Sequence, residues 1–359
     1  MRQVTKLAAA VLCGALGIAP LAACGATSTS AGSGASGSSS SGSGKSALAK
    51  VGMAYDVGGR GDQSFNDSAA RGLDKAKTQF GFQTKELEAV QGESDADRVQ
   101  RLQQLASAGY NPVITVGYSY ATALKQVAKQ YPNTHFAIVD STDVTGSNIT
   151  NLVFTEEQSS YLVGMAAALT SKTGTVGFIG GVNVPLIQKF QVGYEQGVHA
   201  VKPNDKILEQ YLTQPPDTSG FAAPDKGKAA AQGMLSRGAD VIYSAAGSSG
   251  TGAIEAVNAA GKGKWAIGVD SDQYKQDALA KYKSSILTSA VKNVDQAVYE
   301  YLQSDDQGRI LSGVQRFSLA RGGVGYATSG NFLAPDVISK LEAAKKDIID
   351  GKITVKSTL

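Results

Sequence analysis

The segment "AKVGMAYDVGGRGDQSFNDSAARGLDKAKTQF" (residues 49–80) decides the fold class of this chain. Its apolar start, 49–57, predicts a buried strand, and its end, 67–80, predicts an amphipathic helix. A glycine-rich loop lies between them. The same strand, loop and helix order recurs along the chain, as a parallel sheet with crossover helices requires. We therefore predict an α/β protein with doubly wound parallel sheets.

The repeated units are too many for one hydrophobic core, so we expect two lobes with a ligand cleft between them. The first lobe is predicted to comprise residues 48–154 and about 273–312. The second is predicted to comprise residues 155–272 and about 313–359. In the shared C-terminal part we expect helices at 273–283, 292–304 and 335–348 and a strand at 285–291.

The N-terminal residues predict the compartment. Arg2 and Lys6 precede a mostly apolar stretch that ends in "LAAC" (21–24), which is typical of a bacterial lipoprotein signal peptide of residues 1–23. Cys24 would then carry the lipid. Residues 24–47, rich in glycine and serine, are predicted to form a flexible tether. We expect a protein that is lipid-anchored to the extracytoplasmic face of the cell membrane.

The composition argues against several classes of function. The chain has a formal charge of +3, of which Arg2 and Lys6 account for two, so residues 24–359 carry +1 and predict no nucleic-acid partner. The two histidines, His135 and His199, lie on separate predicted elements and are too few for a zinc cluster or a histidine-based triad. We predict no metal, no cofactor and no catalytic residues.

In parallel sheets, ligands bind beyond the carboxyl ends of the strands. Asp56, Tyr118, Asp140, Gly247 and Asp270 each follow a predicted strand, so the cleft should collect three carboxylates.

The loop after the first strand does not fit two familiar motifs. Gly59-Arg60-Gly61 lacks the third glycine of a dinucleotide fingerprint, and Arg60-Gly61-Asp62 is a short motif with a high false-positive rate. Ser64 and Asp67 are spaced as a possible capping box. Phe65 would then either pack back on the helix as a hydrophobic staple or offer its flat face to an aromatic ligand.

The motifs of the folded body resemble one known family. "DVGG" (56–59), Asp62 and "SFN" (64–66) closely resemble the signature of the basic membrane protein family, which comprises purine-nucleoside receptor lipoproteins of ABC transporters. The resemblance continues through "FAIVD" (136–140), "TEEQSSYLVGMAA" (155–167), "VGFIGG" (176–181), "PLIQKFQVGYEQG" (185–197), "DVIYSAAG" (240–247), "IGVDSDQ" (267–273) and "LTSAVKNVDQAVYE" (287–300). It implies the periplasmic-binding-protein type I fold.

The resemblance also implies roles for individual residues. Asp56, Asn66 and Asp140 would meet the base and Phe65 would stack on it. Asp270 and Lys292 would hold the ribose hydroxyls, and Gly247 would let backbone amides approach the sugar. The second stacking aromatic is either Phe190, which we prefer, or Tyr243.

Structural alternatives remain open for three of these residues. Asp140 could cap the following loop, Asp270 could begin a turn, and Lys292 could be a solvated residue at a helix start.

The resemblance implies a monomeric binding protein that captures a nucleoside, a purine in our prediction, and delivers it to an ABC permease. One alternative is a sensing receptor of the same fold for a nucleoside or a sugar-like molecule. Another is a nucleoside hydrolase using Asp56 and Asp140, which the scattered acids and the lack of a nucleophile elbow disfavour.

Overall fold

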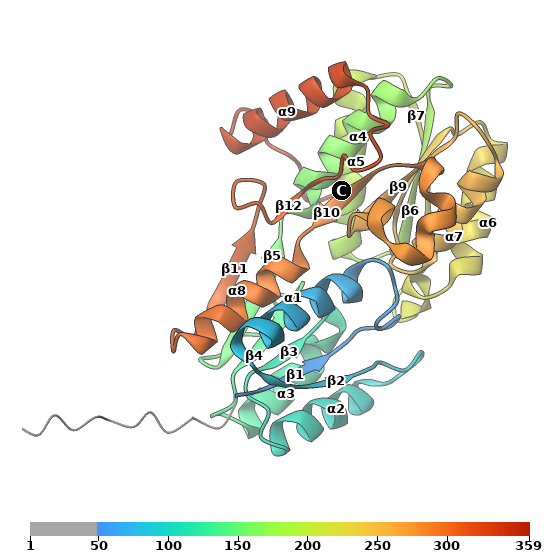
Figure 1. Cartoon of the computed structure of the whole chain (residues 1–359). Coiled ribbons are helices and arrows are strands. Elements are labelled where there is room, and N and C mark those ends of the chain that lie inside the picture. The colour runs from blue at the N-terminus through green and yellow to red at the C-terminus, as the bar shows by residue number, and fades with distance from the viewer. Residues whose placement is uncertain (1–48) are drawn as a thin grey trace, which may run out of the picture. The chain divides into compact units, whose positions relative to one another are not determined.

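The structure is a computed structural model that describes residues 49–359. The predicted signal peptide, Cys24 and the tether lie outside the described residues. The strands of the described part form two six-stranded sheets. We call each sheet with the helices that pack on it a lobe, the first lobe containing β1 and the second β6 (Figure 1).

The first sheet is entirely parallel, in the order β11-β5-β4-β3-β1-β2. Its strands are β1 (Lys50–Ala54), β2 (Gln83–Leu87), β3 (Val113–Thr115), β4 (Phe136–Val139), β5 (Ile149–Phe154) and β11 (Gly313–Phe317). The helices of this lobe are α1 (Phe65–Phe80), α2 (Asp95–Ser107), the 3-10 turn η1 (Tyr118–Tyr120), α3 (Ala121–Gln130) and α8 (Val294–Asp306). Helices α1 and α8 lie side by side (Figure 1).

The second sheet has the order β12-β10-β9-β8-β6-β7, and only β12 runs antiparallel. Its strands are β6 (Thr175–Val182), β7 (Lys206–Thr213), β8 (Val241–Ala245), β9 (Trp265–Asp270), β10 (Ile286–Lys292) and β12 (Val324–Tyr326). Its helices are α4 (Glu156–Thr170), α5 (Pro185–Val201), α6 (Pro224–Ser236), α7 (Ser249–Ala259) and α9 (Pro335–Ile349), with 3-10 segments η2 (Thr218–Phe221), η3 (Gln273–Lys275) and η4 (Asp277–Ser285).

Helix α1 shows how local sequence makes these elements. Leu73 and Ala76 belong to its buried stripe, and Gly81 ends it in the left-handed conformation, with its N–H donating to Lys77 O over 2.9 Å. The predicted capping box does not form, because Ser64 makes no side-chain cap. Asp62 caps the helix instead, and α1 starts two residues before the predicted start.

The division of the C-terminal part between the lobes differs from the predicted one. The strand β10 pairs with β9 in the second sheet, whereas α8 packs on α1 and β11 pairs with β5 in the first. Residues 273–292 therefore belong to the second lobe and 294–317 to the first. Apolar runs of this kind suit either sheet, so their pairing depends on long-range contacts.

Two predicted helices also change. Residues 273–283 form the 3-10 segments η3 and η4 rather than an α-helix. The helix predicted to start at residue 292 starts at Val294, because Lys292 pairs with Val324 as the last residue of β10. Lys292 therefore lies at the carboxyl end of a strand, where pocket residues are expected.

The chain passes between the two sheets three times: at Thr155, at Asn293 and within residues 318–323. These crossings are hydrogen-bonded to one another. Thr155 N donates to Phe317 O over 3.1 Å, and Asn293 N donates to Gly323 O over 2.8 Å. The arrangement gives the two lobes a common connection of three adjacent backbone segments.

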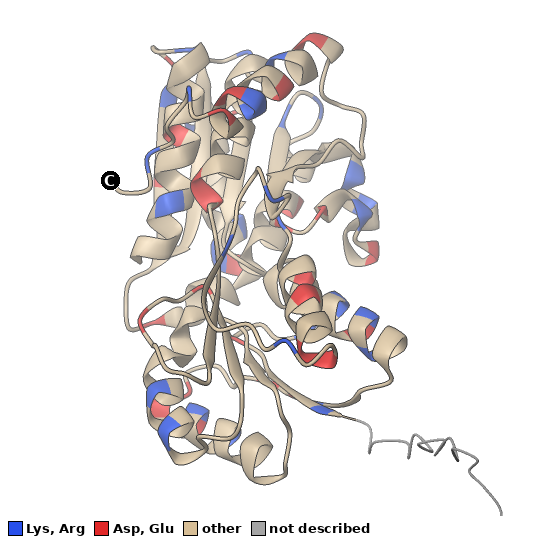
Figure 2. Ribbon diagram, turned by 90° about the vertical axis from the view of Figure 1, so that its left-hand side faces the viewer, with Lys and Arg blue, Asp and Glu red and all other residues tan. Residues whose placement is uncertain are grey.

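Helices α4 and α5 pack closely, because a Cβ at Gly193 of α5 would overlap the backbone of Glu157 in α4. Lys and Arg are interspersed with Asp and Glu on the outer helices (Figure 2). Among residues 49–359, we find no helix with the length and apolar character that crossing a membrane requires.

Candidate functional site

A pocket lies beyond the carboxyl ends of strands from both sheets. It encloses about 540 Å³ of space, part of which is open to solvent. All eight residues predicted to bind the ligand line it: Asp56, Phe65, Asn66 and Asp140 from the first lobe, and Phe190, Gly247, Asp270 and Lys292 from the second. The structure thus brings together residues that are up to 236 positions apart, while ligand binding by them stays a prediction.

Tyr118, which the strand-end rule indicated, also lines the pocket. Further walls are formed by residues that the sequence reasoning left out of the site: Val57, Asp62, Gly117, Leu186, Ile187, Phe221, Ala245 and Val269. Several of them stand at or just after strand ends, so the rule that found Asp56 could have found them. Leu186, Ile187 and Phe221 carry no such signal, because they lie at the start of α5 and in η2. Only the folding of α5 and η2 over the second sheet places these three side chains in the wall.

Asp56 follows β1 and is buried. Its Oδ1 accepts hydrogen bonds from Val57 N over 2.8 Å and from Ser119 Oγ over 2.9 Å. Burial raises the pKa of this carboxyl from 3.8 to about 6, although the two donors act in the opposite direction. Both donors bind Oδ1, so Oδ2 is the oxygen with capacity to accept from a ligand.

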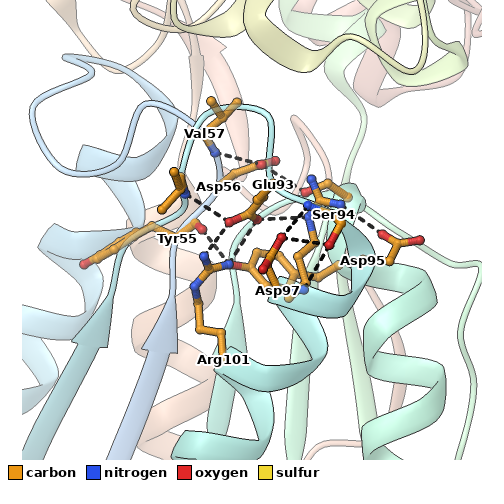
Figure 3. Close-up of polar contacts among 12 residues, drawn as sticks. Tyr55, Asp56, Val57, Glu93, Ser94, Asp95, Asp97 and Arg101 are labelled. Carbon is orange, nitrogen blue, oxygen red and sulfur yellow. Dashed lines mark hydrogen bonds and ion pairs between the residues drawn. The ribbon is translucent and has the colours of Figure 1, made fainter.

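A polar network stands behind Asp56 and fixes the loop before α2. Arg101 pairs with Glu93 (Figure 3) and also donates to Tyr120 Oη over 2.8 Å. Tyr120 Oη in turn donates to the carbonyl of Tyr55, one residue before Asp56, over 2.7 Å. The backbone that presents Asp56 is therefore held from α2 and η1.

Asp62 organises the start of α1. Its carboxylate accepts from the backbone N–H groups of Ser64, Asn66 and Asp67 over 2.8, 2.8 and 3.1 Å. It also accepts from Asn66 Nδ2 over 3.0 Å, and Asn66 Oδ1 accepts from Asp56 N over 3.1 Å. Burial raises the pKa of Asp62 to about 6. The loop thus holds Asn66 against Asp56.

Asp140 and Asp270 share an unusual backbone. Both are in the left-handed region, with φ of +69° and +61°, which residues other than glycine seldom adopt. One carboxylate oxygen of each, Oδ1, is buried and has no hydrogen-bond partner among residues 49–359. Buried acceptors without a partner are costly, and strained backbone of this kind is typical of functional sites. The Asp140 carboxylate does not cap the loop that follows it, because Oδ1 has no partner and Oδ2 accepts from Lys292.

Lys292 is the pocket's cation. Its Nζ lies 2.5 Å from Asp140 Oδ2 and 3.6 Å from Glu156 Oε1, and only 2% of its side chain is exposed. Burial alone would lower the pKa of Lys292, but the charges of Asp140, Glu156 and Asp270 together raise it. The solvated alternative for Lys292 is wrong, because the residue ends a buried strand.

Glu156 was not predicted as part of this cluster. It is the first residue of α4, fully buried, and its Oε2 lies 3.6 Å from Lys189 Nζ. Burial raises its pKa from 4.5 to about 7, and the two lysines counteract this only in part. Its position beside the first crossing segment links the charge of Lys292 to the connection between the lobes.

Aromatic rings surround Lys292. Its Nζ lies 4.8 Å from the ring centroid of Phe65 and 5.6 Å from that of Phe190. Tyr243 does not line the pocket: it is fully buried, and its hydroxyl lies 3.2 Å from Ser160 Oγ. Of the two candidates for the second stacking residue, the structure therefore places only Phe190 in the pocket. Phe65 lines the same pocket from the first lobe.

The chain is similar over most of its length to proteins of one known family. Residues 49–358 match the family described as ABC transporter substrate-binding protein, PnrA-like. The CD4+ T-cell-stimulating antigen of Listeria monocytogenes serovar 1/2a is 37% identical over 85% of this chain and 87% of that protein. The ABC transporter nucleoside-binding protein BmpA of Lactococcus lactis subsp. cremoris is 33% identical over 86% of this chain and 89% of that protein.

A similar architecture is found among solved structures. A crystal structure of ABC transporter system solute-binding proteins from Aeropyrum pernix K1 aligns with a TM-score of 0.74 and 27% identity, covering 85% of this chain and 92% of that chain. The predicted periplasmic-binding-protein fold and the resemblance stated from the motifs are both confirmed. The chain belongs to the PnrA-like family of ABC transporter substrate-binding proteins.

Proposed function

We propose that this protein is a monomeric, lipid-anchored, extracytoplasmic receptor that binds a purine nucleoside in the pocket and delivers it to an ABC permease. The observation that carries the proposal is that one pocket holds two carboxylate oxygens without partners, on Asp140 and Asp270, together with the buried Lys292 and the rings of Phe65 and Phe190 near it. A flat ligand with several N–H and O–H donors suits that combination.

The base and the sugar would use different parts of the pocket. Stacking of a base on an aromatic side chain contributes about 1–3 kcal/mol, which suits Phe65 and Phe190. Asp56, Asp140 and Asn66 can bind ring N–H and exocyclic amino groups. Asp270 accepts from hydroxyls and Lys292 donates to them, so together they match a vicinal diol. Gly247, with φ of +54°, leaves room for close approach of the backbone to the sugar.

The test is titration calorimetry on protein that has been unfolded and refolded to remove any ligand retained from the cell. We expect purine nucleosides to bind more tightly than pyrimidine nucleosides, and monosaccharides not to compete. Absence of heat with every nucleoside would refute the proposal, and binding of a monosaccharide alone would redirect it to the sensing alternative. Incubation with inosine should return intact nucleoside, since release of free base would identify a hydrolase.

Delivery and anchoring have their own tests. Cells that lack the protein should lose uptake of labelled nucleoside, and normal uptake would favour a sensing role.

Cys24→Ala should move the protein from the membrane fraction to the soluble fraction without changing its nucleoside affinity. Size-exclusion chromatography with light scattering should report the mass of one chain.

A further inference from the structure

The start of α1 in the first lobe contacts the end of β9 in the second lobe directly. Ser64 Oγ donates to Asp270 Oδ2 over 2.9 Å. In the other direction, Ser271 Oγ donates to Ser64 O over 2.7 Å, and Gln273 Nε2 donates to Gln63 O over 3.0 Å. We call these three hydrogen bonds the interlobe latch. They join residues more than 200 positions apart on opposite sides of the pocket.

The latch includes one residue that lines the pocket, Asp270, and one that lies next to a lining residue, Ser64. Ser64 is fully buried and immediately precedes Phe65, and Asp270 is one of the unsatisfied carboxylates. Ser64 has one hydroxyl proton, and its nearest acceptor is Asp270 Oδ2, with Val269 O further away at 3.2 Å. A hydrogen bond to a charged acceptor is stronger than one to a neutral carbonyl. The hydroxyl thus occupies Oδ2 and leaves Oδ1 to a ligand.

Ser271, on the second-lobe side of the latch, makes another hydrogen bond to the first lobe. Arg71 Nη2, about two helical turns beyond Ser64, donates to Ser271 Oγ over 3.0 Å. The Ser271 hydroxyl therefore donates one hydrogen bond, to Ser64 O, and accepts another, from Arg71. Arg71, Ser271 and the Ser64 carbonyl are thus joined in series, and the Ser64 hydroxyl makes a separate hydrogen bond to Asp270.

We infer that Ser64 is a positioning residue that couples closure of the two lobes to recognition of the ribose hydroxyls. Its hydroxyl orients Asp270 only when the first lobe is against the second. A ligand that binds Asp270 Oδ1 is then held by a carboxylate whose other oxygen, Oδ2, accepts the hydrogen bond from Ser64 of the first lobe. This inference rests on the proposed nucleoside-binding function.

The chain offers a matched control. Ser68 lies in the first turn of α1 and is as buried as Ser64, and its hydroxyl accepts from Asp295 N over 3.2 Å, but Asp295 belongs to α8 of the same lobe. Ser64→Ala and Ser68→Ala therefore each remove one buried serine hydroxyl from the same part of the chain. Only the first removes a bond between the lobes.

Affinity and dissociation rate should be measured for a purine ribonucleoside and for its 2′,3′-dideoxy analogue. Ser64→Ala should weaken ribonucleoside binding by about 10-fold or more, chiefly through faster dissociation, since a hydrogen bond to a charged group is lost. The same variant should weaken dideoxynucleoside binding much less, because that ligand cannot use Asp270. Ser68→Ala should bind both ligands as the wild type does.

A second variant tests the latch from the other lobe. Ser271→Ala should speed dissociation of both ligands by a few fold, because it removes the bond to Ser64 O and the bond from Arg71, neither of which involves Asp270. Unchanged affinity in both Ser64→Ala and Ser271→Ala, or an equal loss for the two ligands in Ser64→Ala, would overturn the inference. Neither result bears on the proposed function, which fails only if the wild type binds no nucleoside.

Discussion

The Cα of Gly117 lies against the carboxylate of Asp56, so that a Cβ at residue 117 would overlap Asp56 Oδ2. Gly117 also has φ of +110°, a conformation that side chains rarely allow. Both constraints arise because β3 pairs beside β1, which brings the loop after β3 against the residue that follows β1. Glycine at residue 117 is what allows Asp56 to occupy the pocket wall.

Gly117→Ala should therefore reduce both stability and ligand binding. We expect the free energy of unfolding to fall by about 1–3 kcal/mol and nucleoside affinity to fall at least several-fold, because strain and a displaced Asp56 act together. Gly109→Ala is the control, since Gly109 has φ of +77° with open space around it. It should lose stability but keep its affinity. Equal affinity in Gly117→Ala and the wild type would contradict this reading of the contact.

The ligand-free protein should become less stable as the pH rises from about 4 to 7. Asp56, Asp62 and Glu156 have folded-state pKa values near 6, 6 and 7, above their ordinary values. The folded protein thus holds protons that the unfolded chain releases, and the stability this provides is complete below pH 4 and lost as the pH passes 6–7. Urea unfolding at several pH values measures the slope.

Asp56→Asn isolates one of these groups. A shift from 3.8 to about 6 corresponds to at most about 3 kcal/mol, so the variant should gain up to this amount relative to the wild type between pH 4 and 7. It should also lose nucleoside affinity, because an amide replaces the predicted acceptor. Parallel stability curves for the two proteins would show that Asp56 is not desolvated in solution.

Lys292→Met should destabilise the protein by about 3–5 kcal/mol at pH 8, because Asp140 and Glu156 lose their buried partner. The loss should shrink at pH 5, where Glu156 is protonated. Lys189→Met removes the other, partly exposed lysine near Glu156 and should cost far less. If Lys292→Met is equally destabilised at both pH values, the charge of Glu156 is not what Lys292 balances.

The second stacking aromatic can be identified by two substitutions. Phe190→Ala should weaken purine nucleoside binding by about 10-fold to 100-fold, as loss of a base-stacking surface does. Tyr243→Phe should leave affinity unchanged, since Tyr243 is buried behind the pocket, and reduce stability by about 1 kcal/mol through loss of its contact with Ser160. A drop in affinity for Tyr243→Phe alone would reverse the assignment. Competition calorimetry resolves both cases.

Much of the fold and of the pocket follows from sequence because the rules involved are local. Strand and helix periodicity appears within each segment, and parallel strands place their carboxyl ends on one edge of a sheet. That is why Asp56, Asp140 and Asp270 could be predicted as pocket residues before their partners were known. The same rule indicated Gly247, and the loop before α1 indicated Phe65. The motif resemblance then supplied Asn66, Phe190 and Lys292, and all five residues line the pocket.

The sequence by itself determined the fold class, the strand ends and the eight predicted pocket residues. The tertiary structure alone decided that β10 joins the second sheet and β11 the first, that Asp62 rather than Ser64 caps α1, and that Glu156 lies beside Lys292. The sequence of an apolar strand does not indicate which of the two sheets the strand will join. The pairs Ser64–Asp270 and Asp140–Lys292 join residues 206 and 152 positions apart, and only the packed chain brings such a donor and acceptor within hydrogen-bonding distance.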